Sequence, residues 1–123
     1  MGLTLYDSEE RTFSMNAWNW GVLHHVIRIQ DLFPEERWAP LRSGGGSLEA
    51  PEIATLVDFL EHLFLPELPP GHRMFFDCTT TDAPDNGTLY RGDEMAKNYS
   101  LHHDVLVAFI AYLKTTVGTV RFW

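Results

Sequence analysis

The chain is short of cysteine, of positive charge and of long apolar runs, and each shortage excludes a class of protein. Its 123 residues contain one cysteine, Cys78, which excludes an intrachain disulfide and a zinc site built from several cysteines. Nine Lys and Arg residues stand against 17 Asp and Glu residues, giving a formal net charge of −8. This charge repels phosphate backbones and anionic lipid surfaces. The sequence therefore argues against nucleic-acid and membrane partners and favours a basic protein partner.

No stretch of the chain has the pattern of a targeting or membrane-spanning segment. The first residues, MGLTLYDSEER, lack the basic stretch and the apolar run of a secretory signal peptide. The most apolar segment, Leu101 to Lys114, has about fourteen residues and is too short to cross a bilayer. We therefore expect a cytoplasmic protein, with residues 1–123 forming a single globular domain.

Three segments have the apolar spacing of helices. Residues 17–33 follow Asn16, a favourable N-cap, and end before a proline. Residues 50–64 follow a possible cap at Ser47 or Glu49 and have a clear polar face. Residues 101–114, with Ser100 as the expected cap, are apolar on almost every side. This last segment is predicted to be a core helix covered on two sides.

Alternating side chains predict several strands. Gly2 to Asp7 and Arg11 to Met15 form a predicted hairpin, and Arg73 to Thr80 form a predicted middle strand. Turn-forming residues at 81–87 lead to a short predicted return strand at Thr88 to Tyr90. Val120 and Phe122 predict a C-terminal strand beside the hairpin. The predicted fold class is α+β, with three main helices on a small antiparallel sheet made of the hairpin, the middle strand and the C-terminal strand.

Two histidine pairs, His24-His25 and His102-His103, lie on predicted helices. Adjacent helical side chains point about 100° apart, so each pair can give only one ligand to a shared site. A metal site would therefore join His25, His103 and Asp104 around a divalent transition metal, for binding or for hydrolysis. The chain lacks the His-Glu-x-x-His pattern, and the competing interpretation is ordinary capping or half-buried histidines with no cofactor.

The glycine-rich stretch LRSGGGS, residues 41–47, is predicted to be a loop. Gly44 to Ser47 precede a helix and could cradle an anion, but a Walker lysine and dinucleotide-binding spacing are missing. A plain flexible connection is the competing interpretation. Ser47 and Cys78 lie in no nucleophile motif. The sequence therefore predicts no catalytic residue, and a non-enzymatic role is favoured without excluding an enzyme.

The chain contains four tryptophans, a residue type that is enriched at binding hot spots. Trp18 lies on the apolar face of its predicted helix and is expected in the core. Trp20 and Trp38 have polar neighbours and are expected at the surface, where Glu35 and Glu36 would form a polar rim. These four residues are the predicted partner-binding surface. Alternatively, the Trp-bearing faces pair with each other in a homo-oligomer.

Two stretches, RTFSMNAWNWGVLHHV and GGGSLEAPEIATLVDFL, carry a resemblance. They are similar to small bacterial proteins, some of them like toxin-immunity proteins, that begin with a hairpin followed by a Trp-rich helix. The resemblance implies a cytoplasmic, non-enzymatic role. The leading hypothesis is an acidic, immunity-like inhibitor of a basic protein partner, and the alternative is a metal-binding protein or a metal-dependent hydrolase using the histidine pairs.

Overall fold

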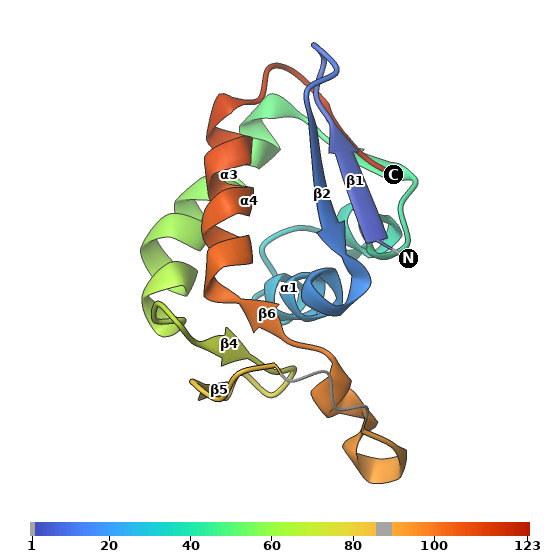
Figure 1. Cartoon of the computed structure of the whole chain (residues 1–123). Helices are drawn as coiled ribbons and strands as arrows, with labels where there is room; N and C mark the ends of the chain where they lie inside the picture. Colours follow the sequence, from blue (N-terminus) through green and yellow to red (C-terminus); the bar gives the residue numbers. More distant parts are fainter. Residues whose placement is uncertain (1, 86–89) are drawn as a thin grey trace.

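The main sheet of the molecule, sheet A, is antiparallel and lies against helices on one side (Figure 1). The computed structural model describes residues 2–85 and 90–123. Sheet A has the strand order β2-β1-β7-β3. Its strands are β1 (Gly2–Tyr6), β2 (Thr12–Asn16), β3 (Gly46–Leu48) and β7 (Val120–Phe122). The α+β class, the N-terminal hairpin and the C-terminal strand beside it are confirmed.

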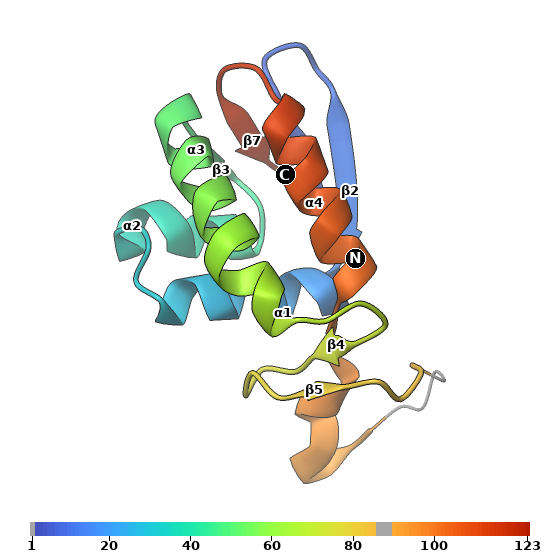
Figure 2. The same ribbon diagram turned by 90° about the vertical axis from the view of Figure 1, so that its left-hand side faces the viewer.

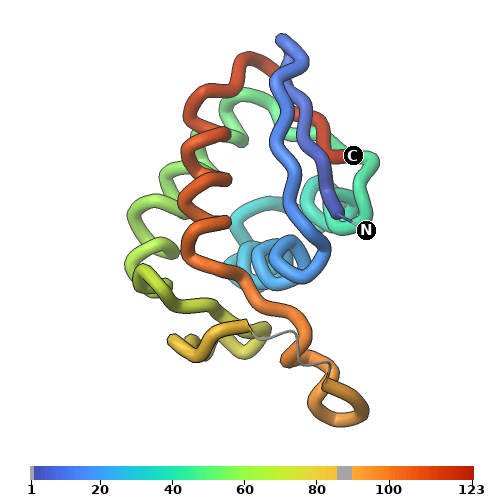
Figure 3. Tube along the Cα trace, in the orientation of Figure 1, coloured from blue at the N-terminus to red at the C-terminus, as the bar shows by residue number. Residues whose placement is uncertain are grey.

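The longest helices are α1, α3 and α4. In chain order the helical segments are α1 (Ala17–Ile29), α2 (Glu35–Trp38), η1 (Ala39–Arg42), α3 (Ala50–Phe59), the π-helical η2 (Leu60–Phe64), η3 (Leu65–Glu67), η4 (Gly92–Asn98) and α4 (His103–Thr115). Helices α3 and α4 lie side by side, and α1 crosses below them (Figure 2; the chain path is traced in Figure 3). Within the described ranges, no helix is long and apolar enough to cross a membrane.

The predicted cap of α1 is confirmed. The side-chain oxygen of Asn16 accepts hydrogen bonds from the Asn19 backbone amide at 2.9 Å and from the Asn19 side-chain amide at 2.8 Å. The helix ends at Ile29, earlier than predicted, because Asp31 turns the chain with a left-handed φ of 55°. Val22 and Val26 of the predicted apolar face are buried, but Trp18 on the same face is 45% exposed and is not a core residue.

Helix α4 starts later than predicted and packs against both α3 and β2. Leu101–His102 form a short strand, β6, so Ser100 is not the cap; it is buried and accepts a hydrogen bond from the Arg73 guanidinium at 3.4 Å. The buried residues of α4 are Leu106, Phe109, Ile110 and Leu113. Val105 and Tyr112 also pack against the core, so both predicted apolar rows are covered, except for Ala108, which is exposed like Val107.

The predicted middle strand forms a second sheet, sheet B, with strand order β5-β4-β6. Residues 73–80 do not run straight, because the Phe75 carbonyl accepts a hydrogen bond from the Cys78 amide at 3.0 Å and Cys78 takes a φ of 67°. This tight turn separates β4 (Arg73–Met74) from β5 (Thr80–Thr81). The middle strand therefore does not join sheet A. Part of the predicted 81–87 turn and the 88–90 strand falls on residues 86–89, outside the described residues.

The glycine-rich stretch supplies the last strand of sheet A, so it is not entirely a loop. Gly46–Leu48 pair with β7, and the Gly45 amide donates a hydrogen bond to the Phe122 carbonyl at 2.7 Å. Gly44 has a φ of 82°, and a Cβ there would come within 2.7 Å of the Trp123 backbone. Gly44 therefore allows a close approach of two backbones.

One hydrophobic core fills the space between sheet A and the helices, with Trp20, Phe109 and Phe122 fully buried in it. Asp7 is a buried carboxylate next to the hairpin turn. Its carboxylate accepts hydrogen bonds from the amides of Glu9 and Arg11, both at 2.9 Å, and from that of Val117 at 3.1 Å. The hairpin turn is thereby tied to the segment between α4 and β7.

Candidate functional site

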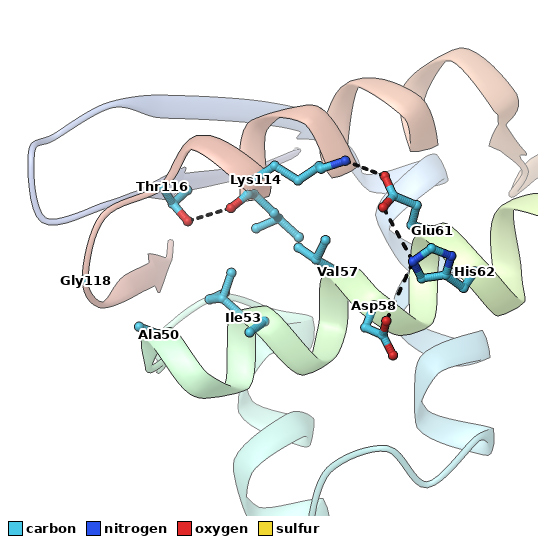
Figure 4. A pocket seen from close by; sticks show the side chains of 11 residues that line it. Ala50, Ile53, Val57, Asp58, Glu61, His62, Lys114, Thr116 and Gly118 are labelled. Atoms are coloured by element: carbon cyan, nitrogen blue, oxygen red, sulfur yellow. Dashed lines mark hydrogen bonds and ion pairs between the residues drawn. The ribbon is translucent and has the colours of Figure 1, made fainter.

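A groove of about 440 Å³ runs between α3 and α4 (Figure 4). Its floor is apolar, formed by Ile53, Val57 and Leu113, of which Ile53 and Leu113 are buried. The other lining residues are Ala50, Ala54, Asp58, Glu61, His62, Lys114, Thr116 and Gly118. An apolar floor with a few charged groups at one end suits a ligand that is itself partly apolar and charged.

Helical periodicity places these side chains in the groove. Ala50, Ile53, Val57 and Glu61 recur every three or four residues, so they lie on one side of α3 and its π-helical continuation. Beyond the end of α4, Gly118 closes the groove with a φ of 70°, and a side chain at this position would collide with the Ser8 hydroxyl.

The charged end of the groove carries more negative than positive charge. Lys114 Nζ lies 2.6 Å from Glu61 Oε2, and this ammonium group holds the pKa of Glu61 below its usual range. His62 Nε2 lies 3.7 Å from both Glu61 Oε1 and Asp58 Oδ1. Figure 4 shows these four side chains turned toward one another. At neutral pH, two carboxylates therefore face one ammonium group, and His62 adds charge only when it is protonated.

The hydroxyl group of the lining lies apart from the charged end. Thr116, the hydroxyl residue of the lining, donates a hydrogen bond to the Leu113 carbonyl at 2.8 Å. It lies at the opposite end of the groove from His62 (Figure 4). The Thr116 hydroxyl therefore has no imidazole beside it to act as its base.

An ion-pair network fixes the start of α3, beside the groove. Glu49 is the N-cap and forms a capping box with Glu52. The Arg37 side chain donates hydrogen bonds to the Glu52 carboxylate at 3.1 Å and to the Ser47 carbonyl at 2.9 Å. This contact lowers the pKa of Glu52 and raises the pKa of Arg37. Ser47, the other predicted cap, lies in β3 instead.

The predicted exposure of Trp20 and Trp38 is wrong, because each is 1% exposed. Trp20 Nε1 lies within hydrogen-bonding distance of the Leu41 carbonyl, at 3.2 Å, and Trp38 Nε1 donates to the His24 carbonyl at 3.0 Å. Buried indoles with satisfied N–H groups are core residues. The predicted rim remains at the surface: Glu35 pairs with Arg28 at 2.7 Å, and Glu36 is exposed.

The predicted metal site is not assembled. His25 packs edge-on against Phe76, with ring centres 5.4 Å apart. His103 and Asp104 line a different, smaller cavity of about 190 Å³, where His103 Nδ1 donates to the Leu68 carbonyl at 2.8 Å. In the part of the chain that the structure describes, no three His, Cys, Asp or Glu side chains are grouped to hold a metal ion.

No protein-family model, no curated protein and no solved structure matches this chain. The resemblance to small immunity-like bacterial proteins therefore stays a prediction. Geometry and charge are the observations that bear on function.

The groove is the feature that sequence reasoning missed. Three of its polar residues could be placed from the sequence, because Asp58, Glu61 and His62 fall on the polar face of the helix predicted at 50–64. Their partner Lys114 lies on another helix, and only the packing of α3 against α4 reveals the pair. No local pattern in the sequence signals such a contact.

Proposed function

We propose that this protein is a non-catalytic binding protein whose groove between α3 and α4 takes a basic, partly apolar segment of another protein. The charged end of the groove carries the proposal, since Asp58 and the ionised Glu61 face the single ammonium group of Lys114. The net charge of −8 supports it, because a negative surface attracts a basic partner over long distances.

Binding would use the two parts of the groove differently. A Lys or Arg of the partner meets Asp58, whose side chain is 80% exposed, and competes with Lys114 for Glu61. Exposed ion pairs of this kind contribute about 0.2–1 kcal/mol each. An apolar side chain that covers about 100 Å² of apolar surface contributes about 2.5 kcal/mol. The apolar floor therefore supplies most of the affinity, and the carboxylates set the orientation and the association rate.

We extend the proposal to inhibition. A small acidic protein that covers a basic surface prevents that surface from reaching its own acidic ligands, because the two compete for the same positive charges. The resemblance to immunity-like proteins supports the same role.

A labelled helical peptide of alternating Leu-rich and Lys-rich faces tests the proposal. NMR chemical-shift mapping is expected to show perturbations at Val57, Asp58 and Leu113, and fluorescence anisotropy is expected to show an affinity that falls as salt rises. Asp58→Lys should weaken binding several-fold. Lys114→Met should strengthen it, because removing the resident ammonium group leaves Glu61 available to the peptide.

Glu36→Lys is the matched control, since it makes the same charge change on the exposed surface of α2. If Asp58→Lys and Glu36→Lys weaken the peptide equally, overall charge and not the groove governs binding. Shifts that map away from α3 and α4 would refute the proposed site.

A further inference from the structure

The outer face of sheet A is bare, although its inner face is covered by the core. Along β1 and β7 the side chains alternate: Leu5 and Phe122 point inward and are fully buried, whereas Tyr6 and Arg121 stand opposite each other on the outer face. Helices α3 and α4 lie on the inner side (Figures 1 and 2). An uncovered sheet face that carries large side chains is a candidate interface.

A hollow of about 380 Å³ lies on this face, lined by Tyr6, Glu10, Arg121 and Trp123. The guanidinium carbon of Arg121 lies 6.0 Å from the centre of the Tyr6 ring. Trp123 is 75% exposed, the largest value among the large apolar side chains of the described residues. Trp, Tyr and Arg are the residue types that dominate binding hot spots.

The charges of this hollow are self-complementary. Arg121 is positive and Glu10 is negative, and within residues 2–85 and 90–123 neither enters an ion pair. In a two-fold symmetric dimer, a residue that meets a second residue across the interface is matched by the reverse contact. A face with one free charge of each sign beside an aromatic pair therefore fits a second copy of itself, whereas a purely basic or purely acidic partner meets one like charge.

We propose that this face binds a second copy of the chain, with Trp123 of each copy entering the hollow of the other and Arg121 facing Glu10 across the two-fold axis. The interface uses none of the residues of the groove between α3 and α4, so it is independent of the proposed binding function. It also differs from the Trp20 and Trp38 faces predicted for a homo-oligomer, which are buried in the core.

Charge exchange tests the pairing, with molar mass measured by light scattering and sedimentation over a wide range of protein concentration. The unmodified protein is expected to dimerise. Arg121→Glu and Glu10→Arg should each weaken the dimer at least tenfold, because like charges then face each other, and the double variant should recover it. Trp123→Ala should weaken the dimer, and neither charge variant should restore it. Arg91→Glu, the same charge change on an exposed residue outside the sheet, should leave the dimer unchanged.

Three results would overturn the proposal. The first is a monomer at every concentration, and the second is a dimer that survives both single charge reversals. The third is a double variant no better than the single variants while circular dichroism shows that all of them are folded.

Discussion

Acidification below about pH 6.5 is expected to destabilise this protein through His24. His24 Nε2 lies 2.9 Å from the Trp38 carbonyl, which can only accept, so Nε2 carries the proton. Trp38 Nε1 donates back to the His24 carbonyl at 3.0 Å, and the two rings stack with centres 4.9 Å apart. This reciprocal contact ties the His24 ring to Trp38 in the core.

Burial lowers the pKa of His24, and the positive charges of Arg42 and Arg28 act in the same direction. The Trp38 carbonyl and Glu35 oppose them and are outweighed. The folded protein therefore binds a proton to His24 less readily than the unfolded chain does. Its contribution to stability is complete above the unfolded pKa of about 6.5 and is lost progressively as the pH falls.

The loss approaches about 1.4 kcal/mol for each pH unit below the unfolded pKa, until the folded pKa is reached. Urea unfolding at about pH 7.5, 6 and 5 measures it. His24→Gln is expected to be less stable near pH 7.5, because the ring stacking is lost, and to show a flatter pH dependence. Identical pH profiles for the original protein and His24→Gln would refute the reasoning.

Three further variants test other parts of the fold. Burial raises the pKa of Asp7, but hydrogen bonds from the surrounding amides outweigh burial and lower the pKa overall. The stabilisation that Asp7 provides should therefore be lost as the pH falls below about 4. Asp7→Asn should lower the thermal midpoint at pH 7 and make the midpoint less dependent on pH in this acidic range. Trp38→Ala should cost about 3–5 kcal/mol in urea unfolding, and an equally large cost for the half-exposed Trp18→Ala would contradict the burial argument. Asn16→Ala should cost about 0.5–2 kcal/mol by removing the bonds to Asn19, and an unchanged unfolding midpoint would count against the cap.

Local chemistry made several elements of the fold readable from the sequence. The hairpin, the Asn16 cap and the polar face of α3 each depend on neighbouring residues, and each was predicted. The three-residue strand at Gly46–Leu48 was not, because its partner, β7, lies far along the chain. Three residues are also too few to show an alternating side-chain pattern, so only the backbone pairing reveals this strand.

The tryptophans show why the candidate site could not be read in the same way. The apolar spacing of α1 placed Trp18 on the face of the buried Val22 and Val26, and the polar neighbours of Trp20 placed that residue at the surface. The row that contains Trp20 is buried, since its indole fits between Leu41 and Phe122, and Trp18 rests on Tyr99 at the surface. The groove and the bare sheet face likewise depend on how distant elements pack.

The position of β7 inside sheet A governs the order in which the molecule assembles. The pairing of Leu5 with Phe122 closes almost the whole chain into a loop, which costs entropy before any contact compensates for it. The β1–β2 hairpin forms from local contacts, so it can form before β7 pairs with β1. We therefore expect docking of β7 between β1 and β3 to be the slow step of folding.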